Sequence, residues 1–171
     1  MGAPPDVTPE YFQILVVREL RKVGLDVGEP RVQRRSELPE PQQGFVLELL
    51  APLSRGAWRK RALIACYRQD IPVRQAIVEE FRPRVATAKA DFGVIVSTAD
   101  FEVEAVAAAQ QAGIALLQVV DGRKAYDLSG WGSAGHYPAW LPAHALQLVE
   151  RDPSGAVRLR PLEAGSFEAW C

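Results

Sequence analysis

The chain has 171 residues, which is enough for one domain with a hydrophobic core and a modest extension. Hydrophobic residues make up 48% of the chain and charged residues 24%, a composition that is ordinary for a globular protein and argues against a disordered one. The formal net charge is −1, so a nucleic-acid-binding role would have to depend on a local basic patch.

The cysteines and the N-terminal segment bear on the compartment. Cys66 lies within an apolar run, where a buried thiol is expected, and Cys171 is the last residue, so we expect no disulfide bond between them. The first ten residues lack a basic region followed by an apolar stretch, and no segment approaches 18 consecutive apolar residues. We therefore expect neither secretion nor a membrane partner, and we predict a cytoplasmic protein.

The first half of the chain contains one helical and two strand-like patterns. Apolar residues at helical spacing predict a helix from the N-cap residue Thr8 to a stop at Gly24. Residues 28–43 are polar and proline-rich, which predicts an exposed loop with at most a short strand. Residues 44–52 are almost wholly apolar, as in a strand buried on both faces, and a second strand is predicted over residues 58–68.

The following segment alternates helices with apolar strands. Asp70 and Pro72 indicate the start of a second helix, in which Pro83 should introduce a kink. Asp100 can cap a third helix that ends at Gly113. The two remaining strands are predicted as apolar runs over residues 92–98 and 114–120.

These elements predict an α/β protein with the order α-β-β-α-β-α-β. The first two strands are close enough to form a hairpin, and the last three strands require right-handed crossovers between parallel strands. The result is a three-layer core, a mixed central sheet with helices on both faces. We assign residues 1–125 to this core and residues 126–171 to a C-terminal extension, in which a Pro-Gly turn predicts a β-hairpin.

One segment has a specific sequence pattern. Residues 90–101 read ADFGVIVSTADF and are followed by an Ala-rich helix and by AGIALL, residues 112–117. With the two strands before Pro72 and Val73, this pattern resembles the Mrr-like family of restriction endonucleases, a branch of the PD-(D/E)xK nucleases, over about residues 8–121. The resemblance implies a restriction-endonuclease-like fold and Mg²⁺-dependent phosphodiester hydrolysis. In this family an acid on one strand and a Glu or Gln on the next hold the ion, and a Lys two residues later helps to activate water.

Most positions of that catalytic signature carry other residues here. Glu48 is the only acid on the first strand, and the second strand has Ala65 and Tyr67 where the family has Glu or Gln and Lys. Gln13 stands in the first helix, where many members have Glu. The resemblance therefore implies a degenerate site with no intact catalytic residue, in which Glu48 is the only candidate metal ligand. Glu48 is either a residual ligand or a structural acid at a strand end, which faces a loop or pairs with an arginine.

Other residues suggest competing functions. Lys60 and Lys89 are candidates for a lysine that has migrated within the site, although the sequence places both away from the expected position. Trp58 is followed by three basic residues, and an aromatic side chain beside several cations suits contacts with nucleic acid. The simpler interpretation is the solvated start of a strand. His136 and His144 have no metal-ligating neighbours at a suitable spacing, so no zinc site is expected. The candidate nucleic-acid-binding residues are Arg34, Arg35, Arg59, Lys60 and Arg61.

The leading hypothesis is a catalytically inactive restriction-endonuclease-like protein that acts by binding a protein or a nucleic acid, a homodimer being one such partnership. Two alternatives stay open: an active Mg²⁺-dependent DNA endonuclease with a rearranged site, and a non-cleaving DNA-binding sensor. Under the leading hypothesis no cofactor is expected. Under the first alternative the protein would use Mg²⁺. Trp131, Trp140 and Trp170 in the extension either form a partner interface or pack within the chain.

Overall fold

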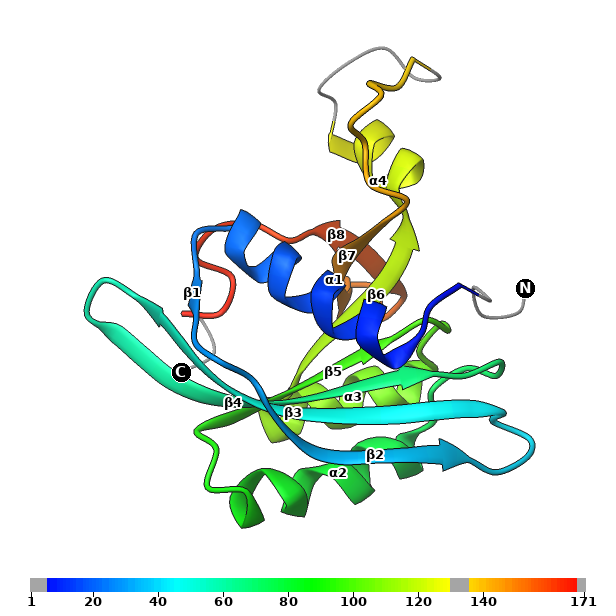
Figure 1. Ribbon diagram of the computed structural model, residues 1–171. Coiled ribbons are helices and arrows are strands. Elements are labelled where there is room, and N and C mark those ends of the chain that lie inside the picture. The colour runs from blue at the N-terminus through cyan, green and yellow to red at the C-terminus, as the bar shows by residue number, and fades with distance from the viewer. Residues whose placement is uncertain (1–5, 130–135, 169–171) are drawn as a thin grey trace.

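The computed structural model describes residues 6–129 and 136–168, and within these residues it contains four helices and eight strands (Figure 1). In chain order they are α1 (Pro9–Lys22), β1 (Asp26–Val27), β2 (Arg31–Leu38), β3 (Gly44–Arg55), β4 (Trp58–Arg68), α2 (Gln75–Thr87), β5 (Phe92–Ser97), α3 (Val103–Ala112), β6 (Ala115–Asp121), α4 (Gly122–Ser129), β7 (His144–Arg151) and β8 (Val157–Pro161). None of the helices in these described ranges is both long and apolar enough to cross a membrane.

All eight strands belong to one mixed sheet. Its order is β1-β3-β4-β5-β6-β7-β8, and β2 pairs with β3 on the same side as β1. The β3–β4 hairpin is antiparallel, the strands β4, β5 and β6 are parallel, and β7 and β8 continue the sheet as an antiparallel hairpin. Helix α1 covers one face, while α2 and α3 cover the other (Figure 1). The predicted α/β fold and its C-terminal hairpin are confirmed.

Hydrophobic residues fill both spaces between the sheet and the helices. Phe12 of α1 is completely buried against one face, and Phe81 of α2 is completely buried against the other. Gly93 in β5 allows α2 to lie close to the sheet, because a Cβ atom added there would be 2.6 Å from the Phe81 ring. Helix α3 ends as predicted at Gly113, whose φ of 69° is in the left-handed region that favours glycine.

Two predicted helix starts were wrong by a few residues. Helix α2 begins at Gln75, after Val73 has formed an isolated bridge with Phe101. The backbone around this bridge is extended, since the Val73 amide donates to the carbonyl oxygen of Asp100. Asp100 therefore does not cap α3, and Glu102 occupies the N-cap position. In both cases a strand-like backbone contact displaced the start that the capping residues predicted.

Two segments contain more regular structure than we predicted. The sequence predicts mainly a loop over residues 28–43, but β2 occupies eight residues of this segment. Its side chains are mostly exposed because β2 lies at an edge of the sheet, so it lacks the apolar pattern of a buried strand. A β-bulge interrupts its pairing with β3 between Val32 and Arg34. Helix α4 follows β6 directly in a segment for which the sequence predicted no element.

Candidate functional site

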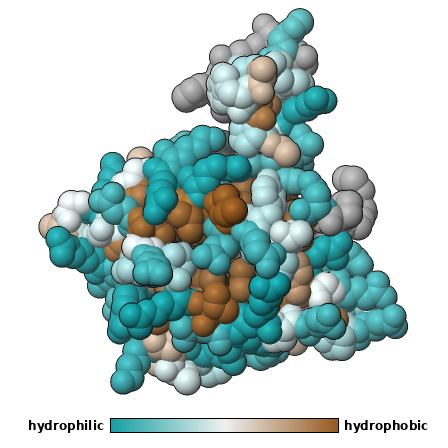
Figure 2. All heavy atoms as spheres, in the orientation of Figure 1, coloured by the Kyte–Doolittle hydropathy of each residue, from teal (hydrophilic) through white to brown (hydrophobic). Residues whose placement is uncertain are grey.

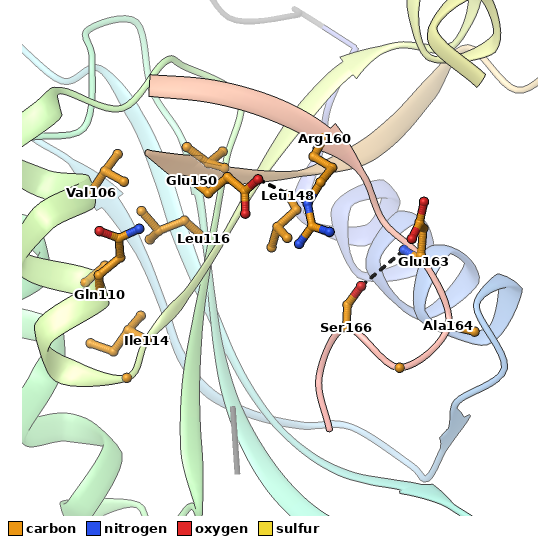
Figure 3. A pocket seen from close by; sticks show the side chains of 14 residues that line it. Val106, Gln110, Ile114, Leu116, Leu148, Glu150, Arg160, Glu163, Ala164 and Ser166 are labelled. Atoms are coloured by element: carbon orange, nitrogen blue, oxygen red, sulfur yellow. Dashed lines mark hydrogen bonds and ion pairs between the residues drawn. The ribbon is translucent and has the colours of Figure 1, made fainter. Parts of the chain in front are cut away.

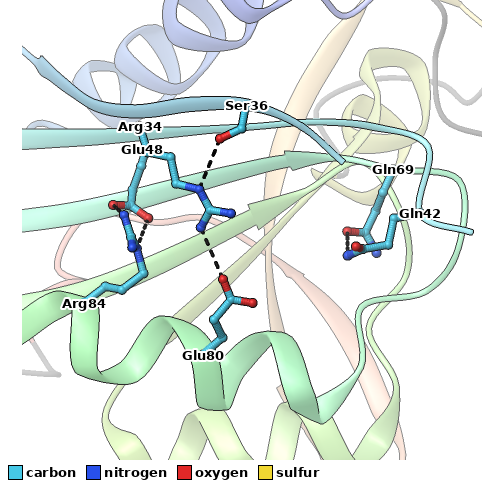
Figure 4. A network of polar contacts seen from close by, with 7 residues as sticks. All are labelled: Arg34, Ser36, Gln42, Glu48, Gln69, Glu80 and Arg84. Atoms are coloured by element: carbon cyan, nitrogen blue, oxygen red, sulfur yellow. Dashed lines mark hydrogen bonds and ion pairs between the residues drawn. The ribbon is translucent and has the colours of Figure 1, made fainter. Parts of the chain in front are cut away.

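Glu48 of β3 is a buried carboxylate in the sheet (Figure 4). Its side chain is only 2% exposed. Its neighbours across the adjacent strands are Arg34 of β2 and Ala65 of β4. Leu47 and Leu49 on either side belong to the core beneath α1, so alternation along the strand directs Glu48 towards α2. A carboxylate in such a place is costly unless its charge and both of its oxygens are compensated.

Arg84, in the last turn of α2, supplies that compensation. Its Nε donates to Oε2 of Glu48 and its Nη2 donates to Oε1, both at 2.8 Å. This bidentate geometry matches the planar guanidinium to the planar carboxylate and is among the stronger charged hydrogen-bonding arrangements. The hydrogen bonds with Glu48 raise the pKa of Arg84, so the guanidinium stays charged.

A second ion pair lies beside the first (Figure 4). Arg34 Nη1 is 3.3 Å from Oε1 of Glu80, which comes from α2, and Arg34 Nε donates to the Ser36 hydroxyl. The site thus contains two carboxylates and two guanidinium groups, and their formal charges cancel. Glu80 is 61% exposed, so solvent screens this second pair more strongly than the pair made by Glu48.

The two positions on β4 provide neither a ligand nor a cation. Ala65 is completely buried opposite Glu48, and Tyr67 is 3% exposed on the same face. Burial raises the pKa of Tyr67 to about 12, and the negative charge of Glu80 contributes to the shift. The Tyr67 phenol is therefore neutral at ordinary pH. It cannot supply the positive charge that a lysine would bring to developing negative charge on a phosphate.

The residues around Glu48 do not fit a divalent metal ion. Magnesium prefers several oxygen ligands in a near-octahedral arrangement, and here the single buried carboxylate already accepts both of its hydrogen bonds from Arg84. The nearby guanidinium groups would also repel a second cation. Within residues 6–129 and 136–168, no group of three or more His, Cys, Asp or Glu side chains is placed to hold a metal.

The remaining residues predicted for a nuclease site lie elsewhere. Gln13 belongs to α1, which covers the opposite face of the sheet from α2. Lys60 lies opposite Leu53, near the turn of the β3–β4 hairpin and away from Glu48. Lys89 follows α2, and its carbonyl oxygen accepts a 2.7 Å hydrogen bond from the Arg61 guanidinium. The structure brings Glu48, Ala65 and Tyr67 together but adds neither lysine to them.

The five residues predicted to bind nucleic acid do not form one basic patch. Arg34 is paired with Glu80, Arg35 with Glu10, and Arg61 with a backbone carbonyl. Arg59 and Lys60 make no ion pair with any residue that the structure describes, but they are consecutive in β4 and so point to opposite faces. A cavity of about 430 Å³ touches Arg59, Lys60 and Arg61, and the acids Asp26 and Asp91 also line it.

The sequence analysis missed Arg84 and Glu80, the two residues by which α2 closes the site. A signal for Arg84 was present, because it lies three residues after Phe81, which is on the inward-facing side of the helix. A cation next to that apolar stripe is a suitable partner for a carboxylate in the neighbouring buried strand. Glu80 lies one turn before Arg84, but its side chain is mostly exposed and no sequence pattern distinguishes it from Glu79.

Two other cavities lie away from Glu48. One of about 390 Å³ is bounded by α3, by Glu150 of β7 and by the turn after β8, as Figure 3 shows. Among its polar groups, Arg160 pairs with Glu150, and the Ser166 hydroxyl accepts from the Glu163 amide. Another, of about 460 Å³, lies between the end of α1, α4 and the start of β7, and Trp140 is on its rim.

The comparisons with known proteins agree with this architecture. Residues 6–124 match the Mrr_cat model, which describes restriction endonucleases. No curated protein and no solved structure matches the chain. The matched segment covers well over half of the sequence and runs from α1 to the start of α4, so it includes the strands of Glu48 and Tyr67 and the helix of Arg84. The chain therefore belongs to the Mrr_cat restriction endonuclease family.

Proposed function

We propose that this protein is a non-catalytic member of its family and acts by binding a protein partner. The observation that carries the proposal is the set of residues at the positions where the family would hold its metal ion. Ala65 and Tyr67 are buried where the resemblance calls for a ligand and a lysine, and the remaining acid, Glu48, is engaged by Arg84. Metal-assisted hydrolysis needs a cation with open coordination positions and an activated water, and this arrangement provides neither.

The charge distribution supports a protein partner over a nucleic acid. Binding to a phosphate backbone depends on several cations that are free to neutralise phosphates from one surface. Here most of the candidate arginines are engaged within the chain, and Arg59 and Lys60 point to opposite faces. The formal net charge of −1 adds no long-range attraction for a polyanion.

Exposed apolar side chains support the same proposal. Trp140 is 71% exposed beside the cavity between α1 and α4, and aromatic residues are enriched in protein interfaces. On the face viewed in Figure 2, hydrophobic side chains are visible among hydrophilic ones around its middle. Ile14 of α1 and Val32 of β2 are also largely exposed. Trp131 and Trp170 lie outside the described residues. A second copy of the chain is one such partner.

Nicking of supercoiled plasmid tests the non-catalytic part of the proposal. We expect no nicking by the wild-type protein with millimolar Mg²⁺ or Mn²⁺, and no difference between the wild type and Glu48→Ala. Metal-dependent nicking that disappears in Glu48→Ala would overturn the proposal and favour the rearranged endonuclease.

Fluorescence anisotropy with duplex DNA separates the two classes of partner. At low salt we expect the wild type to bind no more than an unrelated protein of similar charge. Binding that falls steeply with added salt and is lost in the double variant Arg59→Ala and Arg61→Ala would instead identify a DNA-binding sensor.

Sedimentation of the wild type and of Trp140→Ser over a range of concentrations tests whether the partner is a second copy of the chain. In that case the wild type alone would associate as its concentration rises.

A further inference from the structure

Arg84 has a geometric role that goes beyond the loss of catalysis. It comes from α2, whereas its partner Glu48 comes from β3, and the two side chains meet through two hydrogen bonds of 2.8 Å each. The Arg84 side chain is 38% exposed, so its stem crosses from the surface to a carboxylate beneath α2. The positive group therefore reaches Glu48 from the helix side (Figure 4).

We propose that the guanidinium group of Arg84 permanently takes the place of the divalent cation at this site and holds α2 against the sheet. This rests on the proposed function, because a working nuclease would need Glu48 free for a metal. The arginine supplies one positive charge and two donors on a fixed plane, which satisfy both Glu48 oxygens at once. A metal would satisfy the same oxygens but needs further ligands, and Ala65 and Tyr67 do not provide them.

A second ion pair connects α2 to the edge of the sheet. Arg34 of β2 is the cross-strand neighbour of Glu48, and it reaches Glu80 of α2. One ion pair thus runs from β3 to α2 and the other from α2 to β2. The four charges balance without an ion from solution, so chelators and divalent metals should leave this packing unchanged.

Thermal unfolding of matched arginine variants tests the proposal. Arg84→Ala leaves a buried carboxylate without a counter-charge, and we expect its Tm to fall by about 6–20 °C. Arg82→Ala is the control, because Arg82 lies on the same helix, is exposed, and makes no ion pair with a described residue. Its Tm should stay close to that of the wild type. Equal Tm values for Arg84→Ala and Arg82→Ala would overturn the proposal.

Chemical rescue distinguishes a missing cation from a general loss of packing. Millimolar guanidinium ion should raise the Tm of Arg84→Ala and leave the wild type and Arg82→Ala unchanged, because only the first variant has an empty place for it. Millimolar Mg²⁺ or Mn²⁺ should leave the wild-type Tm unchanged. A rise in wild-type Tm with either metal, or the absence of any guanidinium effect on Arg84→Ala, would contradict the proposal.

Two further variants keep the test decisive if Arg84→Ala does not fold. Arg84→Lys retains the charge but not the planar pair of donors, so its Tm should lie below that of the wild type. The double variant Glu48→Leu and Arg84→Leu removes both charges and should be more stable than Arg84→Ala. Wild-type stability in Arg84→Lys, or a double variant that melts no higher than Arg84→Ala, would overturn the inference. Metal-dependent nicking would overturn the proposed function, whereas these Tm results address Arg84 alone.

Discussion

The two faces of the sheet are built from alternate residues of the same strands, yet they are held together differently. Beneath α1, Leu47, Leu49 and Cys66 belong to the same apolar cluster as Phe12, and the buried Glu19 of the helix accepts a backbone hydrogen bond from β7. Beneath α2, the intervening residues include a buried carboxylate that requires a counter-charge. Glu48 and Tyr67, on the second face, stand at the positions that the resemblance predicts for the catalytic residues.

The comparison indicates which parts of an enzyme fold can change. The apolar residues of the α1 face should tolerate substitutions that conserve volume. The charged face depends on pairs, since the loss of Arg84 would leave Glu48 uncompensated. A buried acid without a metal ion needs an internal cation, and in this molecule Arg84 of α2 provides it.

The largest expected effect comes from a substitution in the apolar core beneath α1. Phe12 is completely buried, so Phe12→Ala removes a ring from the core beneath α1 and should lower the free energy of unfolding by about 3–5 kcal/mol. Urea unfolding followed by circular dichroism measures this change. Ile14→Ala is the control on the same helix, because Ile14 is 61% exposed, and it should cost much less. Equal losses for the two variants would contradict the assignment of this core.

An intermediate effect distinguishes the faces by their response to alkaline pH. Tyr67 has a pKa of about 12 in the folded protein and about 10 when unfolded. Since the folded-state pKa is the higher one, the contribution of Tyr67 is fully present below pH 10 and is lost as the pH rises towards 12. The loss amounts to about 2–3 kcal/mol. Tyr67→Phe should flatten the fall in stability between these two pH values.

Cys66, the preceding residue, gives the matching signal on the α1 face. Burial raises the pKa of its thiol, and an unfolded thiol ionises at about pH 8.5. The loss of stability from Cys66 should therefore begin at lower pH than that from Tyr67. Urea unfolding across this pH range should show that Cys66→Ala removes the first phase and Tyr67→Phe weakens the second. Alkaline profiles unchanged by both variants would show that neither group titrates as described.

The smallest expected effect concerns the outer ion pair. Glu80 is mostly exposed, so Glu80→Ala should lower the free energy of unfolding by at most about 1 kcal/mol. The loss should shrink as salt is added, because screening weakens exposed pairs first. Glu79→Ala on the same helix serves as the reference in the same urea experiment. A loss as large as that of Arg84→Ala would mean that the outer pair, and not Glu48, fixes α2.

The sequence was sufficient for the core strands because burial leaves a strong pattern. Residues 44–52 and 92–98 are apolar runs, and both became strands in the sheet. The edge strand β2 was largely missed because one-sided exposure makes its sequence resemble a loop. Glu48, Ala65 and Tyr67 share a face as the resemblance implied, since they occupy neighbouring positions on a β-hairpin.

The partner of Glu48 was harder to predict, because it lies on a helix and not on a neighbouring strand. The spacing of Val73, Ile77, Phe81 and Val85 indicates an inward face of α2, but Arg84 lies beside that stripe and not within it. Whether such an arginine turns inward depends on where the helix sits on the sheet. That position is set by contacts distant in sequence, such as the approach of Phe81 to Gly93.

The bulge in β2 limits how copies of this molecule can associate. An extended strand at the border of a sheet offers free amide and carbonyl groups to any other extended segment. Here the irregularity between Val32 and Arg34 disturbs that regular row, and the arginines of β2 place charge along it. The addition of a strand from another copy at this edge is thereby discouraged.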